Sequence, residues 1–279
     1  MRGPMEPRLH PSADVQARSN LAPPLFHRVL GNLDSPLLAV ALHHGDAVRS
    51  EVAPLLALDA DRRRAEEDPL TGVWAEIAQN RLVALRSRFE VDLNRPPETA
   101  IYLTPEEAWG LDVWRARPPP EVVARSLAEH ASFYGAAREI LSALIARNGR
   151  VLVLDLHTYN HRRGGPGAPP ADPAHNPELN VGTGSLDRER WGHVVDRFID
   201  AARDGGAVDV RENVRFRGGY FAGWAHRAFP EEVCVLALEV KKTFMDEHDG
   251  CVVLRELVAW RERFRVAASV ALGALEGGA

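Results

Sequence analysis

Cysteine is scarce in this chain. Its 279 residues include only Cys234 and Cys251, which do not have CxxC spacing. Cys234 lies inside an apolar run, where a buried thiol is usual. These features argue against a disulfide framework and against a zinc site built from thiolates.

A strong excess of charge is also missing. The 34 basic and 39 acidic residues give a formal net charge of −5, without a long run of either sign. Such a chain has no electrostatic footprint for nucleic acid or for an anionic membrane. We therefore expect a small-molecule partner, no nucleic acid and no membrane, and the sequence indicates no particular oligomeric state.

Residues 1–25 lack the apolar stretch of a secretory signal or a membrane anchor, and they contain five prolines among scattered charges. The 45% hydrophobic composition of the chain is sufficient for one large core. We expect a flexible N-terminal arm over residues 1–25, a single catalytic domain over residues 26–279 and a cytoplasmic protein.

Several motifs of other enzyme classes are absent. No G-x-S-x-G, P-loop or G-x-G-x-x-G sequence occurs. Their absence argues against a serine hydrolase, a nucleoside triphosphatase and a dinucleotide-binding enzyme.

Three apolar runs of strand length are present. They read LLAVALH at 37–43, VLVLDLH at 151–157 and VCVLALEV at 233–240. Continuous apolar runs of this length suit central strands that are covered on both faces.

Helical patterns separate these runs. They cover residues 72–88, 120–148 with Gly149 as a stop, 186–203 behind Ser185 as a cap, and 252–275. The alternation predicts an α/β fold, with a mixed, mostly parallel central sheet and helices on both faces. The Gly- and Pro-rich stretch at 162–177 predicts an irregular active-site loop or lid.

Three polar groups lie at or near the carboxyl ends of the apolar runs: His43, His157 and Glu239. Ligands of open α/β sheets gather at this edge. A single histidine at a strand end is more often structural, but three such groups on one edge favour a functional site.

The first of these groups belongs to the sequence HHGD, in which His43 and Asp46 have H-x-x-D spacing. Together with His157 they would supply two nitrogens and one carboxylate and leave a fourth position open, as in catalytic zinc sites. We predict one Zn²⁺ ion at these three residues, with Glu239 as the base that takes a proton from water. Glu67, in the acidic run EEDP at 66–69, is a competing third ligand, although that run could also be solvated or cap a helix.

Other polar residues fit supporting roles. Asp155 shares a strand face with His157 and could orient its imidazole, or it could cap a loop. Residues 88–95 read as a strand that the following two prolines break, and Asn94 and Arg95 at its end suit recognition of a substrate carboxylate. Arg217, in the sequence RGGY, would add a cation to a substrate pocket. His44 and His43 face opposite sides if the strand continues, so at most one of them can easily be a ligand.

The order HHGD, DLNR, DLHT, RGGY and LALEVKK resembles the N-formylglutamate amidohydrolase family over about residues 37–250. That family is grouped with the zinc carboxypeptidase-like and aspartoacylase-like hydrolases. The resemblance implies an α/β fold, one zinc ion held by His43 and His157, Glu239 as the catalytic carboxylate, and Asn94 with Arg95 at the substrate carboxylate.

Two regions depart from the family pattern. The family commonly has P-H-S-G where this chain has Leu42 to Gly45, so the third ligand stays open between Asp46 and Glu67. The WGLDVW segment at 109–114 and the predicted lid can remodel the pocket.

The leading hypothesis is a metal-dependent amidohydrolase that cleaves an N-formyl- or N-acyl-amino acid. The alternatives are a zinc carboxypeptidase or deacylase acting on another amide, and a non-catalytic homologue that binds carboxylates.

Overall fold

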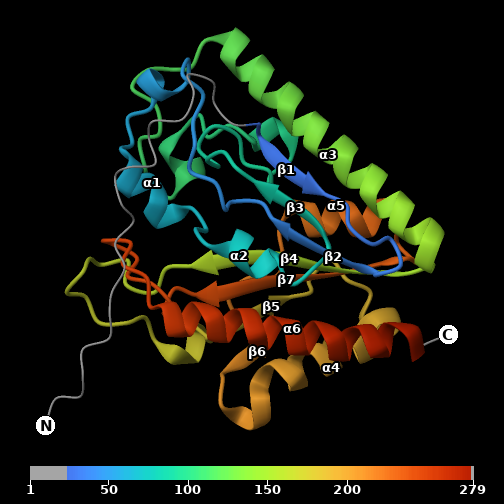
Figure 1. Ribbon diagram of the computed structural model, residues 1–279. Coiled ribbons are helices and arrows are strands. Elements are labelled where there is room, and N and C mark those ends of the chain that lie inside the picture. Colours follow the sequence, from blue (N-terminus) through green and yellow to red (C-terminus); the bar gives the residue numbers. More distant parts are fainter. Residues whose placement is uncertain (1–23, 278–279) are drawn as a thin grey trace, which may run out of the picture.

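The computed structural model describes residues 24–277, which form a seven-stranded sheet with helices on both faces (Figure 1). The strand order across the sheet is β1-β3-β2-β4-β7-β5-β6. The strands are β1 (Phe26–Val29), β2 (Leu37–Ala41), β3 (Asn80–Ala84), β4 (Val151–Tyr159), β5 (Leu179–Gly182), β6 (Val210–Glu212) and β7 (Val233–Lys241).

Most strand pairs are parallel. Strands β3, β2, β4 and β7 run in one direction, and β5 and β6 are parallel to each other. The pairs β1–β3 and β5–β7 are antiparallel. The prediction of a mixed, mostly parallel α/β sheet is therefore confirmed.

The helices are α1 (Ala60–Glu66), α2 (Thr71–Ala75), α3 (Pro120–Asn148), α4 (Arg188–Arg203), α5 (Tyr220–Ala228) and α6 (Leu254–Gly277). Helix α3 has the predicted bounds, with a proline at its first position and Gly149 after its end at a φ of 76°. Glycine adopts this conformation without a steric penalty, so it can end the helix. The N-cap of α4 is Asp187, which accepts hydrogen bonds from two backbone amides, and is not Ser185.

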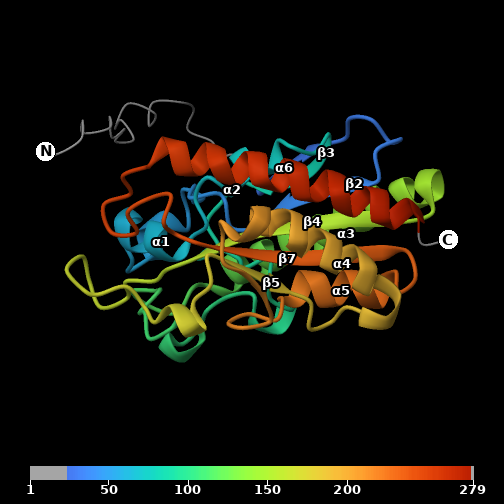
Figure 2. The same cartoon turned by 90° about the horizontal axis from the view of Figure 1, so that it is seen from below.

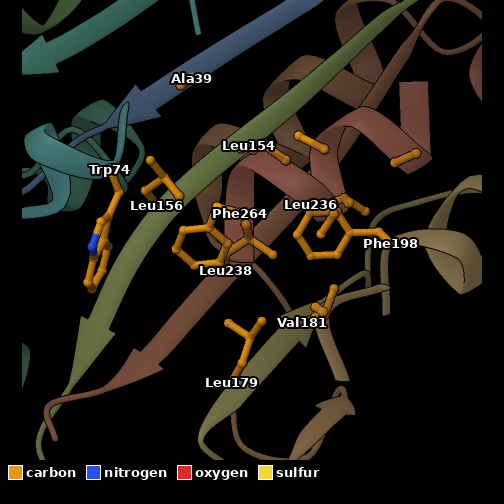
Figure 3. Close-up of a cluster of buried hydrophobic side chains, with 14 of the residues drawn as sticks. Ala39, Trp74, Leu154, Leu156, Leu179, Val181, Phe198, Leu236, Leu238 and Phe264 are labelled. Carbon is orange, nitrogen blue, oxygen red and sulfur yellow. The ribbon is translucent and has the colours of Figure 1, made fainter. Parts of the chain in front are cut away.

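The central strands are buried on both faces because their successive side chains alternate between two cores. In β4, Leu152, Leu154 and Leu156 pack with α2, α4 and α6, whereas Val151 and Val153 pack with α3 and α5. Figure 3 shows the first of these cores, in which side chains of α2, α4 and α6 meet those of β2, β4, β5 and β7. Figure 2 shows α4 and α6 side by side over that face.

Two predicted elements are wrong. Residues 72–88 do not form one helix, because α2 ends at Ala75 and the chain then forms β3, which pairs with β1 and β2. Residues 88–95, read as a strand broken by proline, form turns. The short strands β1, β5 and β6 were not predicted.

The predicted N-terminal arm lies outside the described residues, apart from Pro24 and Leu25. Leu25 is buried in the core next to α3, so the packed part of the chain includes it. Within residues 24–277 no helix combines the length and the apolar character needed to cross a membrane.

Candidate active site

The carboxyl ends of the parallel strands bring the predicted polar groups together. His157 on β4 is the register partner of Glu239 on β7, so both side chains leave the sheet on the face that packs with α3 and α5. His43 follows the end of β2 by two residues. In Figure 1 the arrowheads of β4 and β7 point toward α1 and the loop that follows β4.

Both histidines face one carboxylate. His43 Nδ1 and His157 Nδ1 each lie 3.1 Å from Asp68 Oδ2. Asp68 is two residues beyond the end of α1, and its backbone N–H donates to the carbonyl of His43 at 2.9 Å. Thr158 Oγ1 donates to the other carboxylate oxygen, Oδ1, at 2.8 Å. One ligand atom of each of His43, Asp68 and His157 lies within 4.8 Å of the others, and all three residues are buried.

The outer nitrogens of the two imidazoles also face carboxylates. His43 Nε2 lies 2.7 Å from Asp92 Oδ1, and His157 Nε2 lies 2.9 Å from Asp155 Oδ1. Of the two roles considered for Asp155, the contact with His157 is the one that the structure contains. Such carboxylates fix the tautomer of a metal-binding histidine, because the Nε2 proton is donated to them and the Nδ1 lone pair is left for the metal.

This donor set fits a divalent cation. With neutral imidazoles, two Nδ1 lone pairs and the Asp68 carboxylate would converge without a positive charge between them. A divalent ion between these atoms would supply that charge. Two imidazole nitrogens and one carboxylate are a common ligand set of catalytic zinc.

The electrostatic balance of the cluster agrees with this interpretation. Burial opposes the ionisation of Asp68, but hydrogen bonds from His157 and His43 outweigh it and hold the pKa of Asp68 below its usual value. Burial likewise disfavours the charged form of His157, but Asp155 raises its pKa well above the ordinary value. The cluster therefore attracts positive charge.

The structure does not bring either proposed third ligand to the histidines. Asp46 is exposed and lies outside the cluster. Glu67 is buried and accepts a hydrogen bond from Ser87, and burial raises its pKa to about 7. Gly45 cannot carry a side chain, because a Cβ there would lie 2.0 Å from the backbone carbon of Leu85. His44 belongs to no group of described residues that could hold a metal ion.

Glu239 lines a cavity of about 350 Å³ together with His43, Asp68 and His157. Burial raises the pKa of Glu239 to about 8, although the charge of His157 opposes the shift. A cation bound between the histidines would lower this pKa, because it would favour the ionised carboxylate. The carboxyl group would then titrate in the range that suits proton transfer near neutral pH.

Cationic side chains surround the same cavity. Five of its lining residues carry positive charge: Arg88, Arg163, Arg215, Arg217 and Lys242. Three of these five groups pair with carboxylates or backbone carbonyls: Arg88 donates to Asp92 at 2.8 Å, Arg163 pairs with Glu66, and Lys242 donates to backbone carbonyls. Arg215 donates to Asn176 Oδ1 at 2.8 Å and lies over the ring of Tyr159.

The predicted substrate-binding residues fall into two groups. Asn94 and Arg217 line the cavity. A Cβ at Gly219 would lie 2.3 Å from the Asn94 amide, so the glycine permits this close approach. Arg95 does not line it: its guanidinium donates to the carbonyl of Glu107 at 2.7 Å and lies 4.5 Å from the Tyr102 ring centroid.

The loop at 162–177 borders the cavity, and apart from a short 3-10 turn at Pro173–His175 it is irregular, as predicted. Arg163 of this loop donates to both carboxylate oxygens of Glu66, at 3.0 and 2.9 Å. Trp109 of the WGLDVW segment also lines the cavity, and Arg88 lies 4.9 Å from its ring centroid.

Sequence reasoning did not identify Asp68, Arg88, Asp92 or Lys242 as site residues. Asp68 lies in the motif EEDP and Asp92 in the motif DLNR. The sequence pointed to Glu67 as the candidate ligand in the first motif, and to Asn94 and Arg95 as candidate site residues in the second. Only the three-dimensional arrangement distinguishes these residues from their neighbours.

Comparisons with known proteins identify the family and support the fold. The model of the family "N-formylglutamate amidohydrolase" matches residues 35–245. The structure is similar to that of an N-formylglutamate amidohydrolase from Ralstonia eutropha JMP134, with a TM-score of 0.68 and 17% identity, over 90% of this chain and 99% of that chain. It is also similar to the gene product Atu2144 from Agrobacterium tumefaciens, with a TM-score of 0.62 and 18% identity, over 90% and 96% of the two chains. A search of curated proteins found no significant match.

Proposed function

The chain belongs to the N-formylglutamate amidohydrolase family, and on that premise we propose that it is a zinc-dependent hydrolase of N-formyl- or N-acyl-amino acids. The observation that carries the proposal is the convergence of His43, Asp68 and His157 beside Glu239 in one cavity. His43, Asp68 and His157 would hold the ion.

The bound ion would supply Lewis acidity, which polarises the scissile carbonyl and makes water more acidic. The chain itself contributes the orientation of the ligands. Asp92 and Asp155 hold the outer nitrogens of the two imidazoles, and Thr158 holds the free oxygen of Asp68. These contacts fix the rings and the carboxylate before substrate arrives.

Glu239 is the proton carrier in this proposal. It accepts a proton from the attacking water, whose oxygen forms a bond to the amide carbon. It then returns the proton to the amide nitrogen, the C–N bond breaks, and the products are a carboxylic acid and a free amino acid. For a formyl substrate the acid is formate.

The positive charge of the cavity supports a substrate that carries carboxylate groups. Arg217 lines the cavity, and no hydrogen bond or ion pair of its guanidinium is found within residues 24–277. A guanidinium fork matches the two oxygens of a carboxylate. We propose Arg217 and Asn94 as the groups that bind the substrate carboxylate, and Arg88 as a cation near the reacting carbonyl.

The test is formate release from N-formyl-L-glutamate by purified protein. We expect activity that is lost on chelation and restored by zinc, and a panel of other N-acyl amino acids and short peptides would define the preferred amide. Activity that survives complete metal removal would contradict the metal-dependent mechanism. Absence of hydrolysis across the panel by zinc-loaded protein would favour a carboxylate-binding homologue.

A further inference from the structure

Lys242 is a buried lysine directly after the end of β7. Its exposed fraction is 2%, and the chain has only one other lysine, Lys241. Burying an ammonium group is costly unless its hydrogen-bonding capacity is satisfied. An apolar side chain would fill the same space without that cost, so the contacts of this ammonium group require an explanation.

The ammonium group holds the end of α1. Lys242 Nζ donates to the carbonyl of Ala65 at 2.7 Å and to the carbonyl of Glu67 at 2.8 Å. The last carbonyls of a helix have no partner within the helix, and the negative end of the helix dipole favours a cation there. Lys242 therefore donates to two carbonyls of this turn, of which that of Ala65 also accepts from Asn160 Nδ2 at 2.7 Å, whereas no other donor to the Glu67 carbonyl is found in the described residues.

That turn leads directly into the candidate metal ligand Asp68. The Glu67 carbonyl belongs to the peptide group that joins Glu67 to Asp68, whose N–H donates to the carbonyl of His43 at 2.9 Å. The peptide is thus held from both sides, by Lys242 through its oxygen and by the His43 segment through its nitrogen. Lys242 also lies three residues after Glu239 on the same chain segment.

We infer that Lys242 is a positioning residue that fixes the carboxylate of Asp68 relative to Glu239. It ties the segment that carries the proposed base to the segment that carries the third metal ligand. The inference rests on the proposed function, because it concerns the residue that would hold the ion. Lys242 itself acts through the backbone of residues 65–67 and does not need to contact the substrate.

The test compares Lys242→Met with Lys241→Met by measuring zinc affinity in competition with a chelator. Lys241 is a matched control, since it is the neighbouring lysine and no hydrogen bond or ion pair of its ammonium group is found in the described part of the chain. Loss of a group that orients a metal ligand typically weakens metal binding by about 10- to 100-fold. We expect a loss of that size for Lys242→Met and none for Lys241→Met.

Thermal unfolding of the metal-free variants separates positioning from general stability. A purely structural lysine would lower the unfolding temperature without weakening zinc binding by the folded protein. If Lys242→Met does not fold, Lys242→Gln keeps a donor for one of the two carbonyls, and its zinc affinity should lie below that of the wild type.

The outcomes distinguish this inference from the function it rests on. Equal zinc affinity of the wild type and a folded Lys242 variant would overturn the role of Lys242 alone. If the wild-type protein binds no zinc, the metal-dependent function fails first. Weakened binding in Lys242→Met that is fully recovered in Lys242→Arg would support the role of the donated hydrogen bonds and the charge.

Discussion

Two buried clusters of charged side chains meet at residues 90–92 but differ in how their charges are balanced. The first is the cluster of His43, Asp68 and His157 with its two outer carboxylates. The second is an ion-pair network in which Arg49 and Arg86 both bind Glu90, at 2.6 and 2.8 Å. Glu90 of the network and Asp92 of the first cluster are only two residues apart.

The network pairs its opposite charges without any ligand. Each arginine contacts the Glu90 carboxylate, Arg86 also pairs with Glu129, and the backbone N–H of Arg49 donates to Glu90 at 2.9 Å. In the histidine cluster, by contrast, ligand atoms converge on a point that requires added positive charge. Buried charge alone therefore does not identify a functional site, whereas an unbalanced set of converging donor atoms does.

The largest expected effect concerns Glu239, the proposed base beside the histidine cluster. Glu239→Gln should lower kcat by about 10²- to 10⁴-fold, the usual contribution of general acid–base catalysis, because the amide cannot take the proton from water. Zinc content and unfolding temperature should stay near those of the wild type. Steady-state kinetics with zinc analysis test this, and a wild-type rate would remove Glu239 from the mechanism.

For the ion-pair network we expect a loss of stability without a loss of zinc. Glu90→Gln leaves two buried guanidinium groups without their shared carboxylate, and breaking a buried ion pair costs about 3–5 kcal/mol. The free energy of unfolding in urea should fall accordingly, while the folded protein keeps its zinc.

Glu139→Gln is the matched control for this change. It removes an exposed ion pair with Arg28, and such pairs contribute about 0–1 kcal/mol. If Glu90→Gln were as stable as this control and had instead lost zinc, the network would belong to the site.

His226 is a polar group of a third kind, because it is only partly buried and stays uncharged. Its Nε2 accepts the backbone N–H of Val235 at 3.1 Å, and burial lowers its pKa to about 4 from the ordinary 6.5. Below pH 6.5 the unfolded chain binds the proton and the folded chain does not, so the stability falls as the pH falls toward 4. A pKa lowered from 6.5 to about 4 corresponds to a loss of at most about 3 kcal/mol in the free energy of unfolding at low pH.

Urea unfolding between pH 7 and pH 4 measures this effect. His226→Gln should have a flatter pH dependence than the wild type, whereas His193→Gln, which alters an exposed histidine of α4, should not. Equal slopes for the wild type and His226→Gln would contradict the assignment of a neutral imidazole at His226.

The central strands and the longest helix were predictable because their signals are local. The apolar runs of β4 and β7 place His157 and Glu239 at the same sheet edge, and Gly149 marks the end of α3. The strand β3 was not predictable in this way, since it pairs with β1 and β2 and its short sequence fits a helical pattern equally well.

The third ligand depends on contacts distant in sequence. Asp68 is 25 residues from His43 and 89 residues from His157, and a backbone hydrogen bond to His43 brings it to both. The H-x-x-D spacing pointed to Asp46, but the chain turns away after Gly45 and leaves Asp46 exposed. Arg95 likewise has the residue type for a carboxylate anchor, yet it is held against Tyr102 outside the cavity wall.

The most direct test of the account is the zinc content of three purified proteins: the wild type, Asp68→Ala and Asp46→Ala. We predict one zinc ion per chain in the wild type and in Asp46→Ala, and loss of zinc in Asp68→Ala. Retention of zinc by Asp68→Ala, or its loss from Asp46→Ala, would contradict the proposed ligand set.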